Sequence, residues 1–296
     1  MKSLQPQPDS FRRARPALLA ASLAVMLGVS ACGGGGDDND GAADSRPPEN
    51  VEETPTTPPT TPSSNIKVDG QSQTVQAPTG QVRFALSPAQ WAYGSLSGST
   101  KTADPATLTE AAPGAYSGFP DGDTTVSLLG GTITDLSGNG QYAIGRWTDG
   151  SDSGGGTYNV NQGRGWIVGT PLSVSLAAGQ VLTCELAAAT RPTATSGNVA
   201  PGTIEAASAT FTGTQMLPTG SLTLQYSAGQ DEHQTFTIAN AVSNGYTSSA
   251  QQQYALIGSF AGTDATHPWY LIAYSFNTPT SGPVNGVAAL GCALQS

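Results

Sequence analysis

Charged residues are scarce in this sequence. Asp, Glu, Lys and Arg make up only 11% of the 296 residues, less than half of the usual quarter. Basic residues are rarer than acidic residues. From Cys32 onward there are 7 Lys and Arg against 20 Asp and Glu, a net charge of −13. This balance argues against a basic patch that would bind nucleic acid or an anionic membrane surface.

The sequence also offers no obvious membrane-spanning helix near its start. The apolar run at residues 17–29 has 13 residues, whereas a span needs about 20. This run follows the basic segment Arg12-Arg13-Ala14-Arg15 and precedes Ser30-Ala31-Cys32, which is the layout of a secretory signal. The ending resembles the lipobox of bacterial lipoproteins. The resemblance implies removal of residues 1–31, lipidation of Cys32 and anchoring to the outer membrane, on its periplasmic or its surface-exposed face.

Cysteine is rare, with three residues in the whole chain. If Cys32 carries lipid, Cys184 and Cys292 remain as an even pair in an exported protein, which favours a disulfide. The alternative is two buried free thiols, because a separation in sequence says nothing about the distance in space.

Long helical patterns are absent, and only residues 105–112, after Asp104, predict a short helix. The chain contains 37 Gly and 21 Pro, and short runs of β-forming residues lie between them. Residues 181–186, 221–226 and 234–238 alternate apolar and polar side chains, as a strand with one buried face does. Many short strands at regular spacing predict an all-β sandwich or barrel.

Changes in composition along the chain predict its domain boundaries. Residues 32–65 are rich in Gly, Asp, Pro and Thr and form the expected disordered tether. Residues 66–136 are expected to be a β-rich N-terminal extension. Residues 137–296 are expected to be an antiparallel up-and-down β-barrel, because short connections between consecutive strands build a meander that closes on itself.

Several segments of the second half carry a family pattern. They are Tyr142-Ala143-Ile144-Gly145-Arg146-Trp147, Gly165-Trp166-Ile167-Val168-Gly169, residues 187–193 and residues 282–290. This part of the chain resembles the eight-stranded barrel of transferrin-binding protein B and other surface lipoproteins. The resemblance implies about eight strands, surface exposure and binding of a host protein that carries iron or haem.

Catalytic and metal-binding motifs are missing. The sequence has no Gly-x-Ser-x-Gly elbow, phosphate loop or dinucleotide fingerprint. Residues 135–140 fit the first half of a calcium loop, but Arg146 stands where a bidentate Glu is needed, so a turn is the better interpretation. His233 and His267 lack the spacing of zinc ligands. We therefore expect no enzymatic activity, no metal and no cofactor.

Aromatic residues fall into two groups. Trp147, Trp166 and Trp269 lie on predicted strands and are expected to be core. Another four aromatic residues flank Gly-rich segments that we interpret as loops, and exposed rings there would anchor a partner; they are Trp91, Tyr93, Tyr116 and Phe119. The alternative is that these rings pack the N-terminal extension on the barrel.

The function expected from these features is non-enzymatic binding by a lipid-anchored envelope protein, with a host or extracellular protein as partner. Two alternatives remain open. One is a structural envelope lipoprotein without a specific ligand. The other is a carrier whose barrel interior holds haem or another small apolar molecule.

Overall fold

The computed structural model describes residues 65–70, 75–87, 100–214 and 218–295. Within these ranges the chain is all-β, as predicted, with one turn of 3₁₀ helix at Pro105–Thr107 that the side chain of Asp104 caps. None of the described helical residues is part of a helix long and apolar enough to cross a membrane. Cys32 and nearly all of the predicted tether lie outside the described residues.

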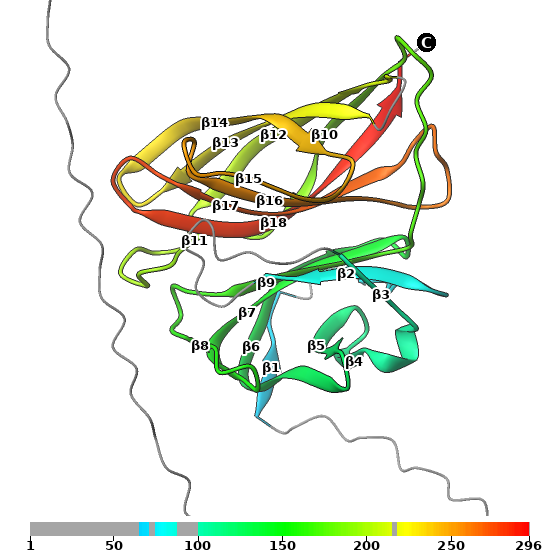
Figure 1. Cartoon of the computed structure of the whole chain (residues 1–296). Helices are drawn as coiled ribbons and strands as arrows, with labels where there is room; N and C mark the ends of the chain where they lie inside the picture. The colour runs from blue at the N-terminus through cyan, green and yellow to red at the C-terminus, as the bar shows by residue number, and fades with distance from the viewer. Residues whose placement is uncertain (1–64, 71–74, 88–99, 215–217, 296) are drawn as a thin grey trace, which may run out of the picture. The chain divides into compact units, whose positions relative to one another are not determined.

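The first sheet has nine strands in the order β3-β2-β9-β7-β6-β5-β4, with β1 beside β6 and β8 beside β7 (Figure 1). All of its pairs are antiparallel except the parallel pair of β1 and β6. The strands are β1 (Ile66–Val68), β2 (Val82–Leu86), β3 (Lys101–Ala103), β4 (Thr109–Ala112), β5 (Ala115–Asp121), β6 (Thr124–Gly138), β7 (Tyr142–Asp152), β8 (Thr157–Tyr158) and β9 (Arg164–Gly169).

The second sheet is the predicted up-and-down antiparallel barrel. Its order is β14-β13-β12-β10-β18-β17-β16-β15, with the short β11 beside β18 (Figure 1). Apart from β11, strands that are consecutive in sequence are neighbours, except β14 and β15, which lie at the two ends of this order; the first strand, β10, pairs with the last, β18. The strands are β10 (Val181–Ala189), β11 (Thr193–Ala194), β12 (Thr203–Thr212), β13 (Thr219–Ala228), β14 (Asp231–Val242), β15 (Asn244–Ser249), β16 (Tyr254–Ala261), β17 (Trp269–Asn277) and β18 (Pro283–Leu294).

The strand pairing moves the start of the barrel from the predicted residue 137 to Val181. Strands β7 and β9, which we expected in the barrel, pair with each other and with β6 and β2 in the first sheet. Alternation of apolar and polar residues identifies a strand but not its neighbours. The prediction of the boundary was therefore wrong, although the strands themselves were found.

The barrel core follows from strict alternation of side chains. On β17, Tyr270, Ile272 and Tyr274 point into the barrel core, whereas Leu271 and Ala273 belong to a separate apolar cluster. Successive residues of a strand point to opposite faces of the sheet, so one strand contributes to two cores.

The outward cluster joins the two sheets. From the first sheet it takes Ile144 and Ile167, and from the barrel Ile257, Leu271 and Val287. All five side chains are almost fully buried. The cluster takes buried side chains from β16, β17 and β18, and Ala188 on β10 and Tyr246 on β15 also pack against it.

A disulfide cross-links two paired strands of the barrel, β10 and β18. Cys184 on β10 lies directly opposite Cys292 on β18, and their sulfur atoms are bonded. The predicted pairing of these two cysteines is thus present, and it joins the first barrel strand to the last.

Candidate functional site

Two of the four aromatic residues predicted to bind a partner are buried in the first sheet. Tyr116 and Phe119 lie on β5, and each is only 1% exposed. The loop interpretation was wrong because residues 115–121 pair with β4 and β6. The other two, Trp91 and Tyr93, lie outside the described residues.

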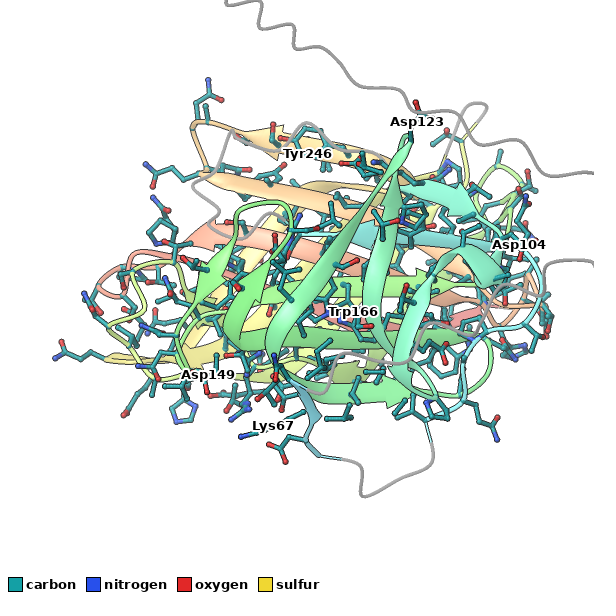
Figure 2. All side chains as sticks on the ribbon, turned by 90° about the horizontal axis from the view of Figure 1, so that it is seen from below. Lys67, Asp104, Asp123, Asp149, Trp166 and Tyr246 are labelled. Carbon is teal, nitrogen blue, oxygen red and sulfur yellow. A yellow bond between two sulfur atoms is a disulfide. The ribbon has the colours of Figure 1, made fainter. Side chains whose placement is uncertain are left out.

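The buried rings pack against the tryptophans that were predicted to be core. The ring centres of Tyr116 and Trp166 are 5.4 Å apart, and those of Phe119 and Trp147 are 5.8 Å apart. The indole nitrogen of Trp147 donates to the backbone oxygen of Tyr116 at 2.8 Å. Figure 2 shows Trp166 among the strands, whereas Asp123 projects at the tip of the β5–β6 turn. Burial raises the pKa of the Tyr116 hydroxyl, and the nearby Glu110 adds to the shift.

The calcium-loop pattern at Asp135 is an ion-paired position instead. The Asp135 carboxylate accepts hydrogen bonds from Arg146 Nε at 2.8 Å and Arg191 Nε at 2.9 Å. The expected turn lies slightly later, where Asn139 Oδ1 accepts from the backbone of Gln141 at 3.0 Å. Because two guanidinium groups occupy the carboxylate of Asp135, it has no role as a cation ligand in this arrangement.

The two histidines lie apart from any metal-ligand cluster. The described residues contain no group of three or more His, Cys, Asp and Glu side chains that could hold a metal ion. His267 pairs through Nδ1 with Asp264 at 3.2 Å. Hydrogen bonds from Thr266, together with His267, lower the pKa of Asp264 to about 2. His233 pairs with a different carboxylate, that of Glu205, at 2.9 Å.

The barrel interior is filled by side chains. The ring of Phe236 stacks on that of Phe276 with centres 4.4 Å apart, and Phe211 meets Tyr270 at 4.8 Å. Burial raises the pKa of the Tyr270 hydroxyl, which donates to the backbone oxygen of Val242 at 2.7 Å. These ring contacts occupy the space in which a carrier would hold its ligand.

The outer face of the barrel is hollowed where β10 and β12 part. Their pairing ends at Glu185 opposite Ser208, although β10 continues to Ala189 and β12 begins at Thr203. Beyond this point β10 pairs only with β18, and β12 only with β13. The result is a fork between two neighbouring strands.

A groove of about 370 Å³ lies over this fork. We call it the fork groove. Its floor is apolar and small, its walls carry hydroxyl and amide groups, and it holds two carboxylates. The lining residues are Glu185, Leu186, Glu205, Ala206, Ala207, Ser208, Thr223 and Gln225.

One end of the fork groove carries a hydrogen-bonded trio. Glu205 accepts from the Ser227 hydroxyl through one oxygen and contacts His233 Nδ1 through the other. The backbone N–H of His233 donates to Ser227 Oγ at 3.0 Å. Hydrogen bonds from Ser227 first, and then from His233, lower the pKa of Glu205, and Glu205 raises the pKa of His233. Sequence reasoning missed this trio because register shifts in β12 and β14 bring its members together.

The trio does not have the order of a catalytic triad. In that arrangement the imidazole lies between the serine and the acid and accepts the serine proton. Here both Ser227 and His233 contact the same carboxylate of Glu205, so the hydroxyl donates to a carboxylate and not to an imidazole. The His233 side chain is 81% exposed. The arrangement holds the Glu205 carboxylate in place and lacks the serine–imidazole contact of a triad.

Comparisons of the chain with protein-family models, with curated proteins and with solved structures found no match.

Proposed function

We propose that this chain is a lipid-anchored protein of the bacterial outer membrane that binds a protein partner without catalysing a reaction. The observation that carries the proposal is the fork groove on a barrel whose interior is filled with packed rings. A filled interior favours binding through the outer surface over carriage of a small ligand. The lipobox ending at Cys32 supports the anchoring, and the resemblance to transferrin-binding protein B makes a host iron or haem protein the first partner to test.

The binding part of the proposal is tested by capture. The full chain, immobilised through a C-terminal tag, is exposed to host serum or secretions, and any retained protein is purified and titrated against the chain. We expect one protein to bind saturably. Absence of saturable binding to any retained protein would favour a structural envelope protein. Release of a bound small molecule on unfolding would favour a carrier.

The anchoring part is tested by Cys32→Ser. We expect the change to abolish incorporation of radiolabelled palmitate and to release the protein from the membrane fraction, because the thiol that receives the lipid is gone. Unchanged labelling and unchanged fractionation would contradict the anchor. Cys184→Ser is a matched control, since it removes a cysteine that is disulfide-bonded instead.

A further inference from the structure

Carboxylates that are shielded from solvent in the first sheet have basic partners. The Asp152 side chain is fully buried and pairs with Arg164 Nη1 at 2.9 Å. Asp135, with its side chain 10% exposed, pairs with Arg146 and Arg191. A buried carboxylate is costly without such a cation, so each pair offsets its own desolvation.

The two carboxylates of the fork groove, Glu185 and Glu205, are exposed and have no Lys or Arg beside them, because the barrel strands contain neither residue. Residues 192–296 include neither, and β10 has none. Glu185 has no hydrogen-bond or ion-pair partner among the described residues. Glu205 meets only Ser227 and His233, so among the described residues a single histidine is the one basic group that faces the two carboxylates of the groove. The groove therefore has unbalanced negative charge.

The positions of the Glu185 and Glu205 carboxylates indicate which kind of cation the fork groove binds. Glu185 pairs with Ser208, and Glu205 lies three residues before Ser208 on β12. With about 3.3 Å per residue and about 4.8 Å between strands, their Cα atoms are roughly 11 Å apart. A single metal ion needs its oxygen ligands within about 2.6 Å of itself. The two carboxylates belong to no group of three or more His, Cys, Asp and Glu side chains among the described residues that could hold a metal ion, so two separate cationic groups on one extended chain fit them better.

The rest of the fork groove also suits an extended chain. Ala206 and Ala207 lie on β12 where it has lost its β10 neighbour, so this edge of the strand presents backbone groups that β10 does not pair. Leu186 and the two alanines give a small apolar floor for the methylene groups of long basic side chains. Extended peptides add to unpaired strand edges in this way, with side chains supplying specificity.

The geometry points to the fork groove as a docking site for an extended, basic segment of the protein partner, with two Arg or Lys side chains reaching Glu185 and Glu205. This inference rests on the proposed binding function and names the chemistry of its partner. The net charge of −13 from Cys32 onward steers such a segment toward the chain.

The probe is the fluorescein-labelled peptide acetyl-Gly-Arg-Gly-Arg-Gly-amide, titrated with the full chain at low salt and followed by fluorescence anisotropy. Its matched control is the same peptide with citrulline for arginine, which keeps the shape and loses the charge. We expect at least tenfold weaker binding of the citrulline peptide. We also expect Glu185→Gln with Glu205→Gln to weaken binding of the arginine peptide about tenfold, since each exposed pair contributes a factor of about two to five.

The control variant is Glu232→Gln, which removes one negative charge, as Glu205→Gln alone does, from an exposed position on β14 that does not line the groove. It should leave peptide binding within a factor of two. Equal weakening by this control would overturn the site in favour of general attraction to a negative surface. Binding of Ca²⁺ that is lost in the double variant, without binding of the peptide, would overturn it in favour of a metal site.

Binding of the purified partner to the wild type and to the double variant distinguishes failure of this inference from failure of the proposed function. If a purified partner binds the wild type and the Glu185→Gln, Glu205→Gln variant equally, the binding function stands and the fork groove is not its site. If the variant loses the partner as well as the peptide, both stand.

Discussion

The first sheet and the barrel are stabilised in different ways. The first sheet contains buried ion pairs, with Arg146 only 1% exposed and held by Asp135. The barrel strands have no Lys or Arg and instead carry the disulfide between Cys184 and Cys292. The difference shows that one chain can use charge in one region and a covalent cross-link in another.

The ion pairs of Asp135 lie at an irregular stretch of strand. Strand β6 pairs with β7 through three register shifts, and Asp135 in β6 has a φ of 56°. A residue with positive φ costs energy unless its surroundings hold it. The two guanidinium groups on Asp135 hold this stretch of β6. Pairing of β17 with both β16 and β18 runs without a shift, and these barrel strands have no such contact.

The largest loss of stability is expected when the aromatic core of the first sheet is disrupted. Phe119→Ala should lower the free energy of unfolding by about 5 kcal/mol, because it leaves a cavity beside Trp147 and Trp166. Urea denaturation measures the change. Leu129→Ala is the control, since Leu129 is 54% exposed and should change stability by less than about 0.5 kcal/mol. Equal stability of the two variants would place Phe119 outside the core.

The second largest loss of stability is expected in the barrel, when its disulfide is removed. Cys184→Ala with Cys292→Ala should cost about 4 kcal/mol, since the disulfide spans 108 residues and restricts the unfolded chain. Thermal unfolding with and without reductant checks this. Reductant should lower the midpoint of the wild type and leave the double variant unchanged. Alkylation of both thiols in the wild type without reductant would show that the bond is not formed.

The third largest loss of stability is expected in the first sheet, when the ion pairs of Asp135 are removed. Asp135→Asn should destabilise the protein by about 3 kcal/mol, because the buried Arg146 keeps its charge and loses its counter-charge. Asp149→Asn is a close control: Asp149 also has a positive φ, 49°, but it is exposed. Denaturation midpoints that fall equally in both variants would mean that the backbone, and not the ion pair, determines the loss.

The smallest effect concerns His233, the one ionisable base of the barrel strands. Glu205 raises the pKa of His233 and Glu232 adds least to this shift. Glu205→Gln should therefore lower that pKa more than Glu232→Gln does, as a titration followed by NMR would show. The pair with charged His233 contributes stability below about pH 6.5, the usual pKa of histidine, and loses it as the pH rises through the raised pKa. An unchanged titration in Glu205→Gln would contradict the pairing.

Strands of the barrel could be predicted because the alternation of apolar and polar residues lies within the sequence of each strand. The alternation at residues 181–186, 221–226 and 234–238 gave three barrel strands at their observed places. The predicted short helix at residues 105–112 was partly right, because only Pro105–Thr107 is helical and Thr109–Ala112 pairs with β5. Local capping chemistry predicted the start of that helix but not its end, which strand pairing sets.

Contacts between distant residues could not be predicted in the same way. Gly114 and Gly118 made residues 115–121 look like a loop, but a Cβ at Gly118 would come within 3.0 Å of the Thr109 side chain. That glycine permits close packing of β4 on β5. The fork groove depends on where pairing of β10 with β12 stops, which no local pattern encodes.

The position of the disulfide also determines what happens if the barrel is cut. Since each of the eight main barrel strands either lies between Cys184 and Cys292 or carries one of them, a protease that cleaves any one loop from β10 to β18 releases no fragment. The new chain ends stay covalently attached on both sides of the break. A nicked barrel therefore keeps its strands in the same molecule and can re-form the same pairs.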